Sequence, residues 1–181
     1  MREHDATLLE QFLRAVDDEL ETAQEIIIIG GAALSIAYRN SYATRDIDLW
    51  SNPSPAFWAA CQRARARLQL DVPVSPAGVA QAPQDFESRL LRVEHLGLKQ
   101  LTVWVPERHD LALMKTVRGA ANDLEAIREM HEEAPLVLET LIARFHETDV
   151  IGSRGMFRLA FLEVVALLFG EPVAQQAAAG L

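Results

Sequence analysis

The chain has 181 residues, half of them hydrophobic, and carries 26 acidic against 17 basic side chains, for a formal net charge of -9. The length and apolar content suit one globular domain with a core of its own. The negative charge repels a phosphate backbone, which excludes broad nonspecific nucleic-acid binding but leaves room for a small local basic groove. The single cysteine, Cys61, excludes a disulfide framework and a cysteine-based zinc site, and it fits a reducing compartment.

Neither a targeting segment nor a membrane span is expected. The first residues, MREHDATLLE, lack the apolar core of a signal peptide. No apolar run reaches the roughly 18 residues that a bilayer crossing needs. The nearest, from Met156 to Gly170, is interrupted by Arg158 and Glu163. We therefore expect a cytoplasmic protein with no membrane partner.

The chain opens with a predicted helix and a predicted buried strand. Apolar residues between Leu8 and Leu20 recur at helical spacing, which indicates an amphipathic helix. Thr7 followed by Glu10 resembles a capping box at the start of this helix. The run EIIII, residues 25–29, is rich in β-branched side chains and does not alternate, as is typical of a strand buried on both faces.

Two glycines end this strand, and a second strand with two aspartates follows. A helix over AALSIAY can open directly after Gly30 and Gly31, and RDIDLW, residues 45–50, alternates polar and apolar side chains as a strand does. The glycines let a bulky anion approach the backbone, and the N–H groups at a helix start favour phosphate. Asp46 and Asp48 lie two residues apart and project from one strand face, where hard oxygen ligands favour Mg²⁺ or Mn²⁺ between them. The pattern predicts a site for a nucleoside triphosphate with a metal.

The remaining predicted elements complete a strand-rich first two-thirds and a helical last third. The strand-rich part continues with a loop at 51–55, a helix at 57–68, a strand at 68–74 weakened by Pro73, a loop at 75–84, and a hairpin of 88–96 with 99–105. Helices are expected at 107–118, 122–131, 136–146 and 155–169, followed by a tail, AQQAAAG, that frays. We expect an α/β fold with a domain over residues 1–130 and a helical extension over 131–181 packed on the same domain.

These residues together resemble the nucleotidyltransferase superfamily. The order strand, Gly-Gly, helix and Asp-x-Asp strand carries the resemblance. The segments GGAAL…TRDIDL and DLALMKTVRGAANDLEAI are similar to AbiEii-like toxin nucleotidyltransferases and related bacterial proteins. The resemblance covers about residues 26–130 and implies a small mixed sheet with flanking helices. It implies metal-dependent transfer from a nucleoside triphosphate, such as ATP, to a tRNA, a protein or a small molecule. It also implies a toxin with an antitoxin partner.

The resemblance assigns a role to each matching residue. The groups that would bind the nucleotide and its metal are Gly30 and Gly31 for the triphosphate, Asp46 and Asp48 for the metal, Lys115 for phosphate, and Arg39 or Arg45 for a further positive charge.

The superfamily also uses a third carboxylate from a neighbouring strand. Asp71 fits that position best and Glu94 competes with it; the residue would help to bind the metal or act as the base towards the acceptor hydroxyl. Asp123 matches a later acidic position of the family. Gly31 in place of the common serine, and Tyr42 where relatives carry arginine, motivate an alternative: a degenerate member that binds nucleotide or a partner without transfer.

We interpret three arginines and the three tryptophans as structural residues and not as parts of a nucleic-acid site. Arg63 and Arg67 share one face of the predicted helix at 57–68 but Arg65 does not, so a solvated face is favoured over a nucleic-acid site. The three tryptophans are expected in the core or at its rim rather than as base-stacking platforms: Trp50, Trp58 and Trp104.

Overall fold

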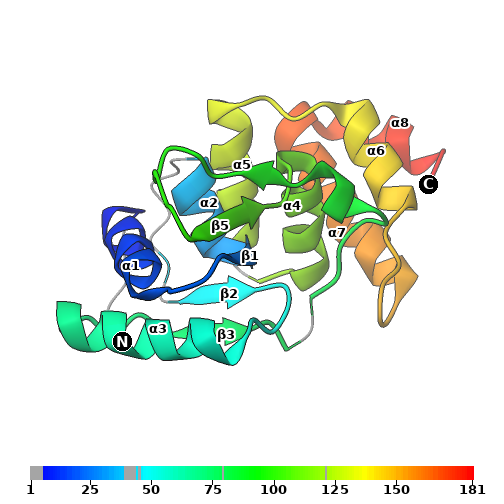
Figure 1. The fold of residues 1–181 in the computed structure, drawn as a ribbon. Coiled ribbons are helices and arrows are strands. Elements are labelled where there is room, and N and C mark those ends of the chain that lie inside the picture. Colours follow the sequence, from blue (N-terminus) through cyan, green and yellow to red (C-terminus); the bar gives the residue numbers. More distant parts are fainter. Residues whose placement is uncertain (1–5, 39–43, 45, 79, 121) are drawn as a thin grey trace. The chain divides into compact units, whose positions relative to one another are not determined.

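A computed structural model describes residues 6–38, 44, 46–78, 80–120 and 122–181 of the chain (Figure 1). Its elements are α1 (Ala6–Glu19), β1 (Gln24–Ile29), α2 (Gly30–Ala37), β2 (Ile47–Leu49), α3 (Pro55–Leu68), β3 (Val74–Pro76), η1 (Phe86–Arg89), β4 (Leu91–Arg92), β5 (Leu101–Val105), α4 (Arg108–Arg118), α5 (Asp123–Glu133), α6 (Leu138–His146), α7 (Arg154–Phe169) and α8 (Glu171–Ala178). The predicted α/β class is confirmed.

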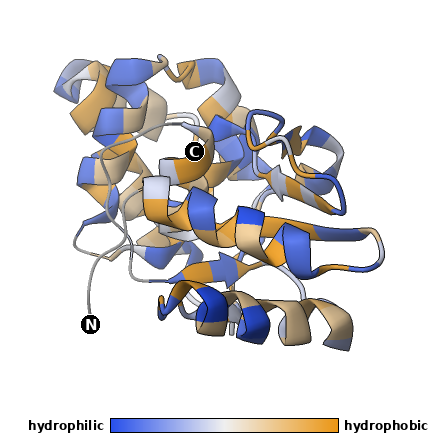
Figure 2. Ribbon diagram, turned by 60° about the vertical axis from the view of Figure 1, so that its left-hand side comes forward, coloured by the Kyte–Doolittle hydropathy of each residue, from blue (hydrophilic) through white to orange (hydrophobic). Residues whose placement is uncertain are grey.

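Contacts group the chain into two compact units. Unit 1 comprises Met1–Gly78 and Leu90–Pro106, and unit 2 comprises Val79–Arg89 and Glu107–Leu181. Helices in both units carry hydrophilic and hydrophobic residues along their length, as amphipathic helices do (Figure 2). The predicted boundary at residue 130 falls inside α5. The domain over residues 1–130 with a helical extension packed on it stays a prediction.

A five-stranded mixed sheet lies in unit 1, with its strands in the order β3-β2-β1-β5-β4. The isoleucine run forms the central strand, β1, which pairs antiparallel with β2 and parallel with β5. At the edges, β3 runs parallel to β2 and β4 runs antiparallel to β5. The central position explains the lack of alternation in the run, because Ile26 and Ile28 are buried and Ile27 is half-buried.

The two faces of the sheet differ in the side chains that they carry. Directly paired residues of neighbouring strands project from the same side, as do residues two apart along one strand. One face holds apolar residues that are at most 3% exposed: Ile26, Ile28, Ile47, Leu49, Leu101, Val103 and Val105. The opposite face, which we call the aspartate face, carries Glu25, Ile27, Ile29, Asp48, Ser75, Arg92, Thr102 and Trp104.

The arginines of α3 tie that helix to the rest of unit 1. Arg63 Nε lies 2.9 Å from a carboxylate oxygen of Glu19, and Arg67 Nη2 lies 3.1 Å from Asp18, both at the end of α1. Arg65 Nε donates to the Val72 carbonyl at 2.9 Å. Arg63 and Arg67 are exposed, as predicted for a solvated face, and their guanidinium groups at the same time make these contacts within unit 1.

A buried carboxylate joins α1 to the start of β5. Asp17 is 6% exposed and lies on the apolar side of α1. Its two oxygens accept backbone N–H groups of Lys99, Gln100 and Leu101 at 2.7–3.0 Å. The negative charge is thus compensated by hydrogen bonds, as a buried ion requires.

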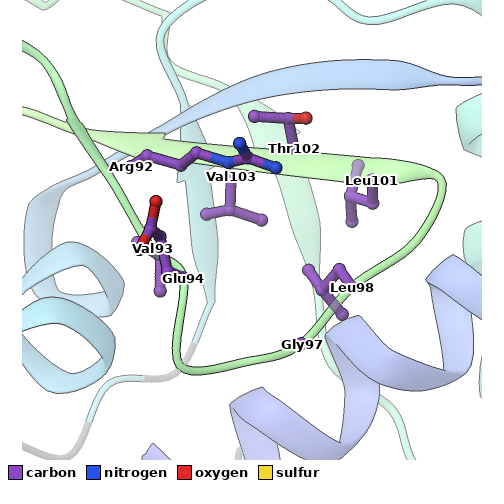
Figure 3. Close-up of a pocket in the computed structure, with 8 residues that line it drawn as sticks. All are labelled: Arg92, Val93, Glu94, Gly97, Leu98, Leu101, Thr102 and Val103. Atoms are coloured by element: carbon purple, nitrogen blue, oxygen red, sulfur yellow. The ribbon is translucent and has the colours of Figure 1, made fainter.

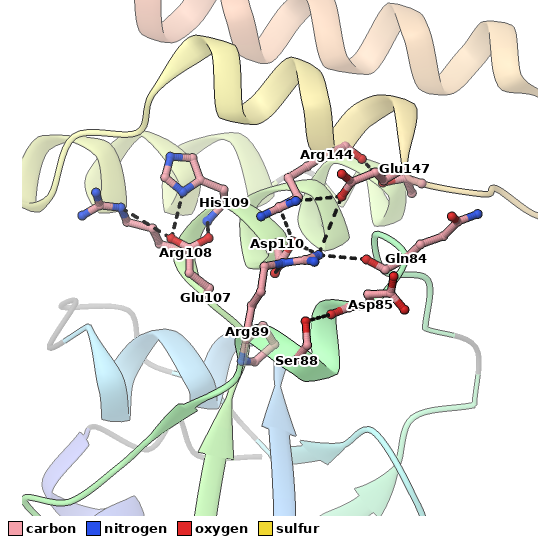
Figure 4. Close-up of polar contacts among 12 residues, drawn as sticks. Gln84, Asp85, Ser88, Arg89, Glu107, Arg108, His109, Asp110, Arg144 and Glu147 are labelled. Atoms are coloured by element: carbon pink, nitrogen blue, oxygen red, sulfur yellow. Dashed lines mark hydrogen bonds and ion pairs between the residues drawn. The ribbon is translucent and has the colours of Figure 1, made fainter.

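An ion-pair network organises the start of unit 2 (Figure 4). Asp110, on α4, is fully buried and receives both Nε and Nη2 of Arg89 at 2.9 Å. Arg144, on α6, places its Nε 3.2 Å from the same carboxylate and its Nη1 2.8 Å from Glu147. Arg89 also donates to the Gln84 carbonyl at 2.9 Å. The network joins η1, α4 and α6, which explains why residues before β4 belong to unit 2.

The segment before β3 differs from the prediction. The predicted strand over 68–74 is wrong for most of its length, because α3 continues to Leu68 and the strand spans only Val74–Pro76. Gln69 ends the helix in a left-handed conformation, with φ of 51°, and its N–H bonds back to the Arg65 carbonyl. The chain therefore needs several residues of irregular backbone before it can pair with β2.

Both ends of the chain also depart from the predicted pattern. Thr7 lies inside α1 rather than at its cap. The tail that was expected to fray forms α8, where Ala174 is buried and Arg158 donates to the Ala178 carbonyl at 2.6 Å. Among the described residues, none of the helices has the length and apolar content for a bilayer crossing.

Candidate functional site

The turn between β1 and α2 lies against a carboxylate. Ile29, the last residue of β1, pairs with Asp48 of β2. Gly30 follows with φ of +68°, and a Cβ placed on it would lie 3.3 Å from Asp48 Oδ2. A left-handed φ and a close neighbour both select glycine here. The structure thus brings the glycine turn next to the aspartate strand, and the predicted site at this place stays a prediction.

Asp48 lies in β2, and Asp46 directly precedes that strand. Ile47 and Leu49 are fully buried, whereas Asp46 and Asp48 are half-buried, which is the alternation of a strand. Thr44, itself 7% exposed, donates its hydroxyl to the Asp46 carbonyl at 3.3 Å and approaches Oδ1 of Asp46 at 3.5 Å. The threonine of TRDIDL thus orients the first aspartate, a role that sequence reasoning missed.

The start of α2 offers backbone donors beside this pair. Gly31 is buried in the first turn, and its carbonyl accepts the Ser35 hydroxyl at 3.2 Å. Ile29 occupies the N-cap position, and an isoleucine side chain cannot accept the first N–H groups of the helix. Arg39 and Arg45, expected to add positive charge, lie outside the described residues, as does Tyr42.

The structure does not place Asp71, the candidate third carboxylate, in a strand, because β3 begins only at Val74. Asp71 is exposed in the irregular segment before β3, while its neighbour Val72 is fully buried. The residue of β3 that pairs with Asp48 is Ser75. Within the described ranges, no group of three or more His, Cys, Asp or Glu side chains is placed to hold a metal ion.

The competing residue, Glu94, lies in unit 1 beyond β4. It is exposed and lines a hollow of about 150 Å³ inside the β4–β5 hairpin, together with Arg92 and Thr102 (Figure 3). The site beside Gly30 thus has two carboxylates on one strand. Two carboxylates suit an Mg²⁺ ion that completes its shell with water and substrate phosphates, and they do not make a closed protein cage.

Lys115 and Asp123 form a buried pair in unit 2. Lys115 is 2% exposed and places Nζ 3.1 Å from Asp123 Oδ1. Arg118 Nε and the Ala120 N–H donate to Oδ2 of the same carboxylate at 2.9 and 2.8 Å. Burial would raise the pKa of Asp123, but the hydrogen bond from Arg118 and the charges of Lys115 and Arg118 hold that pKa below its usual range. Lys115 and Asp123, the two residues that match later positions of the family, thus pair with each other inside unit 2.

Trp104, which was predicted in the core or at its rim and not as a base-stacking platform, lies on the aspartate face. Trp104 is half-buried, and its Nε1 lies 3.3 Å from Glu25 Oε2. The alternation in LTVWV places Trp104 and Thr102 opposite the buried residues of β5, so the signal was present in the sequence.

A mixed sheet with a glycine turn beside an aspartate pair defines the class of the nucleotidyltransferases. The chain matches, over residues 6–158, the family described as "Nucleotidyltransferase of unknown function (DUF6036)". Because the match covers most of its length, the chain belongs to this family, and the predicted superfamily is confirmed. Neither a curated protein nor a solved structure matches the chain. The closer likeness to AbiEii-like toxins stays a prediction.

Proposed function

We propose that the protein transfers a nucleotidyl group from a nucleoside triphosphate, such as ATP, to an acceptor hydroxyl, with Mg²⁺ or Mn²⁺ at Asp46 and Asp48. The observation that carries this proposal is the contact between Gly30 and Asp48, where a Cβ would lie 3.3 Å from Oδ2. A turn without side chains beside a carboxylate leaves space for phosphate oxygens and a metal at one point.

Each residue of the site has a distinct task in this reaction. The backbone N–H groups at the start of α2 bind the triphosphate, and Asp46 and Asp48 hold the metal. A divalent metal held by these two carboxylates would supply charge neutralisation of the phosphates and alignment for in-line attack. The acceptor oxygen forms a bond to the α-phosphorus, the bond to the β-phosphate oxygen breaks, and pyrophosphate leaves. Asp71 is the residue proposed to take the hydroxyl proton.

The acceptor is a tRNA end, a protein side chain or a small molecule in this proposal. The similarity of GGAAL…TRDIDL to AbiEii-like proteins favours a toxin that an antitoxin partner holds in check. The resemblance also assigns a phosphate contact to Lys115, which in the structure is paired with Asp123 inside unit 2.

A second candidate keeps the binding site and omits the transfer. Ser75, not an acidic residue, pairs with Asp48, and the described residues hold no cluster of three potential metal ligands. A degenerate nucleotidyltransferase that binds a nucleotide or a partner without transfer would have such a site, with fewer acidic side chains than an active enzyme.

Calorimetry with Mg²⁺–ATP, together with labelled triphosphates offered to total RNA and cell protein, tests both candidates. Asp46→Asn and Asp48→Asn should fold and lose most metal-dependent binding. Asp71→Asn should keep that binding and lose transfer, which makes it the matched control. Binding by the parent without any labelled product favours the degenerate member. Equal binding by the parent, Asp46→Asn and Asp48→Asn would refute the site.

A further inference from the structure

We propose that Trp104, flanked by Thr102 and Arg92, is the platform on which the base of the bound nucleoside triphosphate stacks. The proposal rests on the proposed function, because it takes the triphosphate to lie at Gly30 and Asp48. It adds the region of unit 1 that recognises the nucleoside part of the substrate.

The strand register places this platform on the same side of the sheet as the aspartates. Asp48 pairs with Ile29 on β1, and two residues earlier Ile27 pairs with Trp104 on β5. Arg92 pairs with Trp104 from β4. Because paired side chains share a face, the carboxylate and the indole both belong to the aspartate face.

The separation of the two groups suits one nucleotide. Trp104 lies two strands away from Asp48 and two residues back along them. With strands about 4.8 Å apart and a rise of about 3.3 Å per residue, the Cα atoms are separated by roughly 12 Å. A nucleotide that bridges this distance has its phosphates at one end, its ribose over Ile27 and its base at the other end.

The indole is held in place and remains accessible. Its N–H donates to Glu25 at 3.3 Å, which fixes the ring on the sheet, and the residue is half-buried rather than packed in the core. Trp58 also binds its N–H to a neighbour, Asn52, but lies on α3 away from the sheet. Unit 1 holds three tryptophans, Trp50, Trp58 and Trp104. Trp58 serves as the matched control for Trp104, because its indole N–H also has a side-chain acceptor while the residue lies on a helix instead of a strand.

The polar groups beside Trp104 are available for a ligand. Figure 3 shows Arg92 extending along β5 towards Thr102, while Val103 points to the opposite side. Arg92 is exposed, and its guanidinium makes no hydrogen bond or ion pair within the described part of the chain. By contrast, other described arginines of unit 1 donate to a carbonyl or a carboxylate: Arg14, Arg63, Arg65 and Arg67.

The chemistry of these groups selects a nucleobase. Every base has a π-face that stacks on an aromatic ring, and a guanidinium donates to ring nitrogen and carbonyl acceptors at the base edge. The glycine turn supplies no such surface, since it recognises phosphate through the backbone. Phosphate binding and base binding are therefore separable by mutation.

The test compares ATP with inorganic tripolyphosphate, each with Mg²⁺, by calorimetry on the full chain. We expect Trp104→Ala to weaken ATP binding about tenfold to a hundredfold and to leave tripolyphosphate binding unchanged. Trp104→Phe should retain most ATP affinity because it keeps an aromatic face, and Trp58→Ala should bind both ligands like the parent.

The outcomes separate this inference from the proposed function. If the parent binds both ligands and Trp104→Ala binds ATP like the parent, the platform is wrong and the phosphate site stands. Equal affinity of the parent for ATP and tripolyphosphate also overturns the platform. If Trp104→Ala loses both ligands while Trp104→Phe binds both normally, Trp104 maintains the fold and the inference fails. If the parent binds neither ligand, the proposed function and the platform both fail.

Discussion

The contact between Gly30 and Asp48 predicts a selective effect of adding a single methyl group. Gly30→Ala places a Cβ 3.3 Å from Asp48 Oδ2 at a residue with φ of +68°. Gly97→Ala is the matched control, because Gly97 has φ of +63° in the same unit and a Cβ there meets nothing within 4 Å. The two variants share the backbone strain and differ in the contact.

The expected magnitudes follow from these two terms. A left-handed φ costs a residue with a Cβ about 1–2 kcal/mol, so both variants should lose that much free energy of unfolding. For a chain of this size, each kcal/mol corresponds to a shift in Tm of about 2–4 °C. In Gly30→Ala the carboxylate or the turn must also move by a few tenths of an ångström, since 3.3 Å is tighter than an ordinary contact. Only this variant should therefore lose affinity for Mg²⁺–ATP.

Urea denaturation and calorimetry measure the two effects on the same samples. We expect similar losses of stability and a loss of Mg²⁺–ATP affinity confined to Gly30→Ala. Equal affinities of the two variants would show that the turn does not position the carboxylate for a ligand, and the argument for the site would fail with it.

Three further predictions concern buried ionisable groups. Asp123→Asn removes the carboxylate that pairs with the buried Lys115 and should cost about 3–5 kcal/mol in urea denaturation. Lys115→Met leaves Asp123 paired with Arg118 and should cost less; equal costs would contradict the pairing. Burial raises the pKa of the Cys61 thiol from 9.0 to about 11, and the charge of Arg65 opposes this shift. Because the thiol of the unfolded chain ionises at lower pH, the free energy of unfolding should fall as the pH rises from about 9 to about 11. Cys61→Ala should lack this part of the pH dependence. Asp17→Asn removes charged acceptors from backbone N–H groups and should cost about 1–3 kcal/mol in the same assay, and a cost no greater than that of the exposed change Asp18→Asn would refute the anchor.

The sequence by itself determined the local part of the site. The isoleucine run, the two glycines and the alternation around Asp46 and Asp48 are patterns within a few neighbouring residues, and they place β1, α2 and β2 to within two residues, with α2 beginning at Gly30 and not after Gly31. The helices from α4 to α7 follow from the same kind of local periodicity. The resemblance to the nucleotidyltransferase superfamily also rests on these short segments, whereas membership of the family rests on a match over residues 6–158.

Only the tertiary structure decided which distant residues meet. The partner of Asp48 on β3 is Ser75 and not Asp71, because the left-handed end of α3 delays the strand. Asp17 interrupts an apolar helix face, yet the backbone N–H groups that compensate it lie more than eighty residues away. The placement of Trp104 on the aspartate face needs two strand registers at once. Strand register and long-range hydrogen bonds depend on how the whole chain closes, so patterns within a short segment cannot specify them.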